Sequence, residues 1–240
     1  IGEHPDVQLP IMVCQDGFLT SHAVENIELL EDDKARAFVG EYNPEDYLLN
    51  AKRPTAVGPY DIVSYYMEHK VSQAHAMMNA KKVILEVAAE YEKLTGRKYG
   101  LFEEYKLDDA EVAIVVINST AGTAKAAIEE MRKEGKKVGL LKIRVFRPFP
   151  MEEIAQALKD IKMVAVMDKC EGFSAAGGPV FAEVRSALYD CTPRPKMINY
   201  VYGLGGRDIT VNHIKEIFNT LLAEKDQEVK DTYRHFGVRG

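Results

Sequence analysis

A carboxylate, a hydroxyl and an imidazole gather just after the first apolar run of the chain. Residues 8–16 predict a buried strand, and Asp16, Gly17, Ser21 and His22 lie at its end or directly after it. Ligands of open α/β sheets bind at the carboxyl ends of strands. Asp16 and His22, residue types of acid–base catalysis, are therefore candidate catalytic residues, and Gly17 and Ser21 are candidate cofactor-binding residues. Alternatively, Asp16 accepts backbone N–H bonds within the turn, and His22 is a solvated residue in a helix that Ser21 caps.

A second candidate site follows the strongest apolar run, Val112–Ile117. An unbroken β-branched run predicts a strand buried on both faces of a parallel sheet. Residues 119–123, with the sequence STAGT, then lead into a helical pattern over 124–131. The start of a helix can bind an anion, so Ser119 and Thr120 are candidate cofactor-binding residues. Alternatively, one of them simply caps the helix.

Two loops, at 171–178 and 203–208, are rich in glycine. Backbone N–H groups in such loops can approach a phosphate closely, which makes Gly205 and Arg207 further candidate cofactor-binding residues. Neither loop has the dinucleotide fingerprint or the Walker sequence. Tight packing of strand–helix corners, and an ion pair between Arg207 and Asp208, are the alternatives. A nucleotide- or CoA-binding α/β module therefore remains a possible function.

The composition describes a globular chain of 240 residues, with 46% hydrophobic residues, 28% charged residues and a net charge of −6. This mild acidity argues against nucleic acid or an anionic membrane as a partner, and no apolar run reaches the roughly 20 residues of a membrane span. We expect no secretory leader, because the first residues have no basic region followed by an apolar one, and Ile1 indicates processing or a start within a longer protein. Cys14, Cys170 and Cys191 form no metal motif and suit a reducing compartment. We expect a cytoplasmic protein whose chain alone binds no metal.

The elements that position these residues form two predicted domains, 1–100 and 101–240. In the first, the pattern predicts a helix, a second strand, an irregular connection lying across a partner subunit and one long helix, over residues 23–30, 34–41, 42–60 and 61–94. Asp61 is the expected cap of the long helix and Gly96 its end, and a break near Ser72 or Asn79 is an alternative to a single rod.

The second predicted domain repeats strand–helix units. Its expected strands are 112–117, 138–146, 163–168 and 196–202, and its expected helices are 124–131, 151–161, 179–189 and 210–222. Right-handed crossovers turn this order into a doubly wound, mostly parallel sheet. The polar tail after Glu224 is expected to lie on a neighbouring subunit.

Five short motifs stand in an order that resembles a known family. They are DGF followed by SH within 16–22, FVGEY at 38–42, STAGT at 119–123, RPFP at 147–150 and YGLGGRD at 202–208. Together they resemble the α subunit of pyruvate:ferredoxin oxidoreductase and related 2-oxoacid:ferredoxin oxidoreductases, over nearly the whole chain. The resemblance implies part of a thiamine-family pyrimidine-side domain over 1–100. It implies a domain like the transketolase C-terminal domain over 101–240.

The implied activity is thiamine diphosphate-dependent oxidative decarboxylation of pyruvate or a related 2-oxoacid. Electrons would pass through iron–sulfur clusters on other subunits to ferredoxin, and coenzyme A usually takes the acyl group. Thiamine diphosphate with Mg would sit at an interface with a partner, so we expect this chain alone to bind no cofactor and to be inactive. The family's catalytic carboxylate and substrate-holding residues match no position here. Residues 169–172, KCEG, depart from the family's usual pattern, which leaves branched-chain 2-oxoacids and oxalate as alternative substrates.

Overall fold

The computed structural model describes residues 1–173 and 177–239, and the chain divides into two compact units. The N-terminal unit consists of Ile1–Cys14 and Ala23–Tyr99, and the α/β unit consists of Gln15–His22 and Gly100–Gly240. The short segment that carries Asp16 and His22 thus belongs to the α/β unit, although the residues on both sides of it do not.

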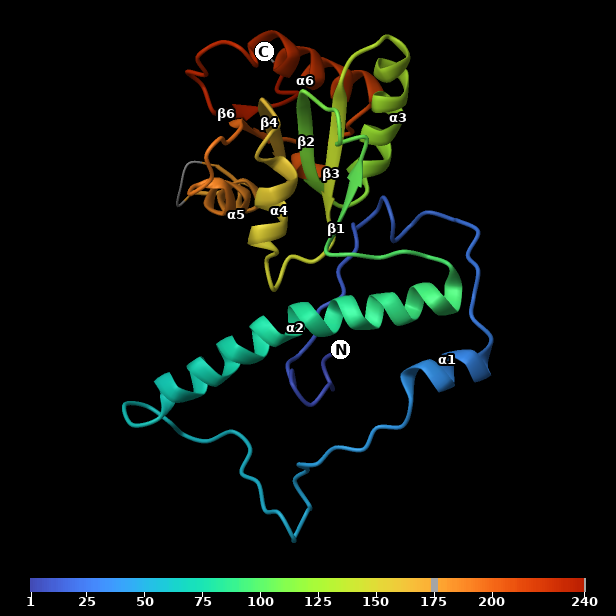
Figure 1. The fold of residues 1–240 in the computed structure, drawn as a ribbon, viewed down its shortest axis with the longest axis vertical. Helices are drawn as coiled ribbons and strands as arrows, with labels where there is room; N and C mark the ends of the chain where they lie inside the picture. Colours follow the sequence, from blue (N-terminus) through green and yellow to red (C-terminus); the bar gives the residue numbers. More distant parts are fainter. Residues whose placement is uncertain (174–176, 240) are drawn as a thin grey trace. The chain divides into compact units, whose positions relative to one another are not determined.

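The α/β unit is built on a six-stranded sheet in the order β1-β3-β2-β4-β5-β6 (Figure 1). Neighbouring strands run parallel, except that β1 is antiparallel to β3. The strands are β1 (Phe102–Tyr105), β2 (Val112–Ile117), β3 (Val138–Ile143), β4 (Met163–Asp168), β5 (Lys196–Val201) and β6 (Tyr233–His235). The predicted mostly parallel sheet is confirmed, and the predicted bounds of β2 and β4 agree with the structure.

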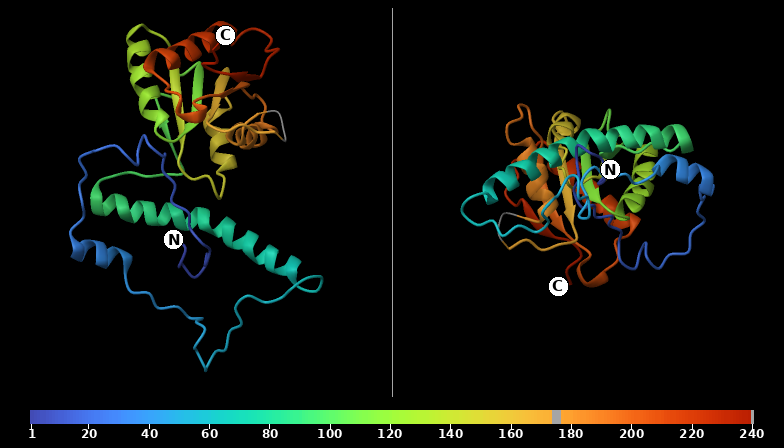
Figure 2. Two further views of the ribbon diagram at one scale, coloured as in Figure 1. Left: turned by 180° about the vertical axis from the view of Figure 1, so that it is seen from behind. Right: turned by 90° about the horizontal axis from the view of Figure 1, so that it is seen from below.

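Helices cover both faces of this sheet, as a doubly wound fold requires (Figure 2). They are α3 (Thr120–Lys133), α4 (Met151–Leu158), α5 (Pro179–Leu188) and α6 (Val211–Glu224). Ile114 and its alternate neighbours face the core beneath α3 and α6, while Val115 and its alternate neighbours face the core beneath α4 and α5. Since both faces of β2 are buried, its sequence is continuously apolar rather than alternating.

The parallel strands β2, β4 and β5 end side by side at one edge of the sheet. The pairing aligns Val116 with Met167, and Asp168 with Val201. The loops that leave these three strands therefore meet at the same edge, which is the place where a doubly wound fold assembles a site.

The two edge strands, β1 and β6, were not predicted from the sequence. The polar tail after Glu224 folds back on its own unit, because β6 pairs with β5 of the same sheet. Arg234 of β6 donates to both carboxylate oxygens of Glu224 on α6, at 3.1 and 2.8 Å. The expectation that the tail lies on a neighbouring subunit is thus wrong for this segment, because an edge strand needs little apolar sequence.

The N-terminal unit contains two helices, α1 (Asp32–Val39) and α2 (Tyr66–Thr95), and among its described residues no strand. The predicted strands at 8–16 and 34–41 and the predicted helix at 23–30 are therefore wrong. Residues 8–16 have no second strand to pair with in this unit, and an unpaired strand is not stable. Residues 34–41 lie largely within α1, because the acidic Asp32 and Asp33 favour a helix N-terminus.

The long helix α2 is unbroken over its 30 residues. It starts after Tyr65 rather than at Asp61, so Asp61 is not its cap; the Asp61 carboxylate instead pairs with His69. Gly96 ends the helix in the left-handed conformation, with φ of 70°, as predicted. The connection at 42–60 is irregular, also as predicted.

Candidate functional site

The turn after β2 is held by Asn118 rather than by the hydroxyls that the sequence favoured. Asn118 adopts φ of 85°, a conformation that asparagine tolerates better than most residues, and its side-chain oxygen accepts a hydrogen bond from the Thr120 N–H at 3.1 Å. Ser119 makes no capping bond, and its buried Oγ has no partner among the described residues. The expectation that Ser119 or Thr120 caps this helix is therefore wrong.

The Asp16 carboxylate lies at the start of α3. Its Oδ2 accepts a hydrogen bond from the Ser119 N–H at 2.6 Å, across 103 residues of sequence. A negative charge is stabilised at a helix N-terminus by the free N–H groups and the helix dipole. The position at which an external anion was considered is thus filled by the chain's own carboxylate. The structure brings together two sequence-predicted site residues, Asp16 and Ser119.

The segment after Asp16 folds into a compact turn. The Phe18 N–H donates to Ser21 Oγ at 2.9 Å, and Ser21 Oγ lies 2.8 Å from His22 Nδ1. The rings of Phe18 and His22 stack with centroids 4.6 Å apart, while the space beside Gly17 is open. Ser21 therefore orients the imidazole instead of capping a helix. Nδ1 of His22 is engaged, and Nε2 has no partner in the described part of the chain.

Thr120 is joined to the end of β5 by a buried hydrogen bond. Tyr202 Oη donates to Thr120 Oγ1 at 2.8 Å, and the tyrosine is only 2% exposed. Burial raises the pKa of the Tyr202 phenol to about 12, and Asp16 and Asp168 add to this effect through their charges. The Lys169 ammonium lies 5.7 Å from the centre of the Tyr202 ring. Asp16, Ser119, Thr120 and Tyr202 thus form one hydrogen-bonded corner at the carboxyl edge of the sheet, which we call the β2–β5 corner.

A second buried network ties β4 and β5 to α5. Asp168 Oδ1 accepts from the Val180 N–H at 2.8 Å, and Oδ2 accepts from the Phe181 N–H at 3.1 Å and from Asn199 Nδ2 at 2.8 Å. Asn199 in turn accepts from the Gly178 N–H at 2.8 Å. Burial raises the pKa of the Asp168 carboxyl, and these donors oppose the shift. The carboxylate therefore caps α5 from inside the sheet edge.

Of the two glycine-rich loops, the one at 171–178 joins the second network through Gly178, and the one at 203–208 follows Tyr202 directly. Arg207 donates to the carbonyl of Gly237 and forms no ion pair with Asp208, so the expected Arg207–Asp208 pair is wrong. Gly205 has open space around it at φ of 66°. In the loop at 171–178, residues 174–176 lie outside the described residues, and Gly178 packs tightly against Asp168. Close packing therefore explains Gly178, while Gly205 and Arg207 remain candidates without a shared site.

The described residues contain no cluster of three or more His, Cys, Asp or Glu side chains placed to hold a metal ion. The start of α3 is already occupied by the Asp16 carboxylate, and a cavity of about 620 Å³ in the α/β unit is lined by carboxylates that repel a diphosphate. A diphosphate is therefore disfavoured at both of these places.

Asn118, Asn199 and Tyr202 were not among the residues singled out from the sequence. Asn118 directly follows the predicted strand 112–117, and Tyr202 is the last residue of the predicted strand 196–202, so their position at strand ends was a usable signal. Asn199 lies in the middle of β5 and is fully buried. A lone asparagine within an apolar strand indicates a buried hydrogen-bonding role, because an unpaired amide in a core is costly.

Removing the Asp16 carboxylate should loosen residues 15–22. In Asp16→Ala, the Ser119 N–H loses its acceptor and α3 loses a favourable charge, which together are worth about 1 kcal/mol. We expect chymotrypsin to cleave after Phe18 roughly fivefold faster than in the parent chain, since local opening controls such cleavage. Glu25→Ala, an exposed carboxylate outside the turn, should leave the rate unchanged. Equal cleavage rates in both variants would show that the Asp16–Ser119 bond does not hold the segment.

No helix among the described residues is long and apolar enough to cross a membrane.

Two family models match successive parts of this chain. A family model described as pyruvate flavodoxin/ferredoxin oxidoreductase, thiamine diphosphate-binding, matches residues 1–89. A second, described as pyruvate:ferredoxin oxidoreductase core domain II, matches residues 110–214. The two models follow one another along the chain, and the first includes the Asp16 turn.

Curated relatives match almost the whole chain. It is 44% identical to pyruvate synthase subunit PorA of Thermotoga maritima, covering 100% of this chain and 60% of that protein. It is 42% identical to the same subunit of Methanocaldococcus jannaschii, covering 94% and 58%. It is 39% identical to the α subunit of NADH-dependent phenylglyoxylate dehydrogenase of Aromatoleum evansii, covering 91% and 54%. The chain thus spans less than two thirds of each of these relatives, and it belongs to the α subunits of the 2-oxoacid:ferredoxin oxidoreductase family.

Proposed function

We propose that this chain forms part of the α subunit of a thiamine diphosphate-dependent 2-oxoacid:ferredoxin oxidoreductase, with pyruvate as the first substrate to test. The two family models, matched in order over 1–89 and 110–214, carry this proposal. The relatives are named as subunits of pyruvate synthase or phenylglyoxylate dehydrogenase, which supports a multi-subunit enzyme acting on a 2-oxoacid. Coenzyme A, ferredoxin and iron–sulfur clusters on other subunits complete the proposed reaction, oxidative decarboxylation.

The role proposed for this chain is to hold one wall of the cofactor cleft. Residues 15–22 fall within the match to the thiamine-binding model, and the Asp16–Ser119 bond fastens them to the sheet edge of the α/β unit. The Ser21 hydroxyl orients the His22 ring so that Nε2 points away from the turn's own hydrogen bonds. We propose that Asp16 acts as a positioning residue, and that His22 faces a cleft completed by a partner. Thiamine diphosphate, which stabilises the carbanion left by decarboxylation, and its Mg ion would be held mainly by residues outside this chain.

The domain division proposed is that residues 1–100 complete a pyrimidine-side domain, and residues 101–240 form the following α/β domain. Large apolar side chains of the N-terminal unit are exposed, including Val24, Leu49 and Val63 at 100%, 87% and 93%. Exposed apolar surface of this kind is typical of a surface that other protein covers. This supports a unit that needs additional protein to complete its core.

The test is 2-oxoacid-dependent reduction of a viologen dye by the complex purified with this chain from its native source. Pyruvate, phenylglyoxylate, 2-oxoisovalerate, 2-oxoglutarate and oxalate are compared, each with and without coenzyme A. We expect activity with pyruvate that requires coenzyme A, at a rate at least tenfold above that with the other acids. Activity on another acid would correct the substrate, and activity without coenzyme A would point to oxalate. An intact, cofactor-loaded complex inactive on every acid would overturn the proposed function.

A further inference from the structure

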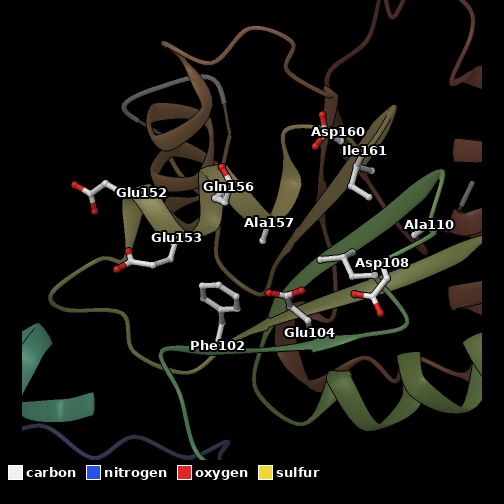
Figure 3. A pocket seen from close by; sticks show the side chains of 11 residues that line it. Phe102, Glu104, Asp108, Ala110, Glu152, Glu153, Gln156, Ala157, Asp160 and Ile161 are labelled. Carbon is white, nitrogen blue, oxygen red and sulfur yellow. The ribbon is translucent and has the colours of Figure 1, made fainter. Parts of the chain in front are cut away.

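The cavity of about 620 Å³ in the α/β unit lies between the edge strand β1 and helix α4 (Figure 3). Phe102 and Glu104 point into it from β1, and Glu153, Gln156 and Ala157 border it from α4. Its floor is apolar, because Leu107, Ala110 and Ile161 are buried beneath it and Phe102 is partly buried. We call this hollow the β1–α4 groove.

Every charged side chain that lines the groove is acidic. The five carboxylates are Glu104, Asp108, Glu152, Glu153 and Asp160, and no Lys, Arg or His is among the lining residues. Glu152 and Glu153 stand in the first turn of α4, where the helix dipole explains them. No such explanation applies to Glu104, Asp108 and Asp160. These three form no ion pair with any described residue, although ion pairs are common elsewhere on this unit.

The same edge of the sheet is open. β1 pairs with β3 on one side only, so its other side presents unpaired backbone groups. β1 shields its α3 side with ion pairs and hydrogen bonds, since Glu103 pairs with Lys125 and Tyr105 bonds Glu129. The α4 side of β1 carries instead the acidic groove. The groove thus combines an apolar floor, a rim of carboxylates and a neighbouring edge strand with unpaired backbone groups. Such a combination is typical of a protein-interaction surface.

From these observations we infer that the β1–α4 groove docks a lysine- or arginine-bearing segment of a partner subunit. The stems of such side chains pack on an apolar floor while their charged ends reach the carboxylates above it. Charge complementarity selects this occupant, because Glu104, Asp108 and Asp160 line the groove and form no ion pair with a described residue. The inference rests on the proposed function only in taking the partner to be another subunit of the oxidoreductase.

The first test is carbodiimide cross-linking of the native complex, which joins carboxylates directly to lysines in contact with them. We expect mass spectrometry to find Glu104, Asp108 or Asp160 linked to lysines of one other subunit. Links from these three residues only to lysines of this chain would overturn the inference. The absence of links, in a complex that cross-links elsewhere, would overturn it if the groove variant described next also retains the partner like the parent.

The second test is a matched pair of triple variants in the intact complex. Glu104→Gln/Asp108→Asn/Asp160→Asn should retain the partner about tenfold more weakly than the parent, with dissociation at lower salt. The control, Asp190→Asn/Glu216→Gln/Glu228→Gln, removes three exposed carboxylates of the same unit that lie outside the groove and should dissociate like the parent. The thermal unfolding temperature of the groove variant should not be lower than that of the parent, because neutralising neighbouring carboxylates removes their mutual repulsion.

The two proposals fail separately. A complex that reduces viologen with pyruvate but shows no groove cross-links, and no effect of the groove variant on subunit retention, rejects the docking surface and keeps the oxidoreductase. Groove cross-links in a complex that is inactive on every 2-oxoacid reject the reaction and keep the docking surface.

Discussion

Gly178→Ala should lower the free energy of unfolding of the α/β unit by about 3 kcal/mol, a cost typical of severe overpacking in a core. A Cβ built at Gly178 lies 2.6 Å from Asp168 Oδ2 and closer still to Asp168 Cγ. The backbone of Gly178 is extended, with φ of −73°, so alanine meets no conformational barrier and the clash alone opposes it. Asp168 cannot move aside without releasing the N–H groups of Val180 and Phe181.

The matched control is Gly122→Ala, since a Cβ at Gly122 meets nothing within 4 Å. Gly122 lies in α3, where alanine is the better helix former, so this variant should be unchanged or up to about 1 kcal/mol more stable. Urea unfolding of the whole chain, followed by circular dichroism, gives both values. Equal midpoints for the two variants would show that Asp168 is not packed against Gly178.

Asp168→Asn distinguishes the network from simple crowding. The asparagine keeps the size of the side chain, but its amide turns donor hydrogens toward the Phe181 N–H and Asn199 Nδ2. Stranding these buried donors should cost about 2 kcal/mol, although the variant no longer buries a charge. Gly178→Ala and Asp168→Asn both act through the contacts of Asp168. The loss of unfolding free energy in the double variant should therefore be smaller than the sum of the losses in the two single variants.

The sequence predicted the central strands well because their signal is local and redundant. β2 is a continuous apolar run of six residues and β4 is a run of five that ends in Asp168, and both runs are bounded by polar residues. Such a run suits only a strand covered on both faces, and the four strand–helix repeats left few alternative topologies. The edge strands β1 and β6 lack this signal, since FEEY and YRH are mostly polar and only a neighbouring strand makes them extended.

The first 60 residues show the opposite case. The apolar run at 8–16 has the composition of a strand, yet Met12 and Val13 are 87% and 94% exposed. Composition alone cannot make a strand where the described unit supplies no second strand to pair with. The curated relatives extend well beyond the length of this chain. This agrees with an apolar segment at 8–16 whose pairing strand is absent from the described residues.

The β2–β5 corner was partly predictable. Position after a real strand selected Ser119 and Thr120, whereas Asp16 was selected from a predicted strand at 8–16 that the structure lacks. The structure nonetheless brings Asp16 to Ser119. The choice of Asn118 as the turn residue depends on its φ of 85°, which no spacing rule supplies. The pairing of Thr120 with Tyr202 joins residues 82 positions apart, and only the parallel order of β2, β4 and β5 makes them neighbours.

Alkaline solution should destabilise the α/β unit through Tyr202. Burial raises the pKa of this phenol from 10.0 to about 12, so the folded chain retains a proton that the unfolded chain releases. The stabilisation is therefore complete below pH 10 and is lost as the pH rises toward about 12. At about 1.4 kcal/mol for each pKa unit, the loss is roughly 2–3 kcal/mol.

Tyr202→Phe should abolish most of this alkaline loss while costing about 1 kcal/mol at pH 8, where Thr120 loses its hydrogen-bond donor. The stability curves of the two proteins should therefore cross between pH 10 and pH 12. Tyr189→Phe removes a phenol that is 70% exposed in the same unit and should follow the parent curve throughout. The measurement is the urea unfolding midpoint of each protein at every half pH unit. Parallel curves for the parent and Tyr202→Phe would mean that Tyr202 ionises as an ordinary exposed phenol. The Tyr202–Thr120 bond would then not be closed in solution, and α3 would lack its buried link to β5.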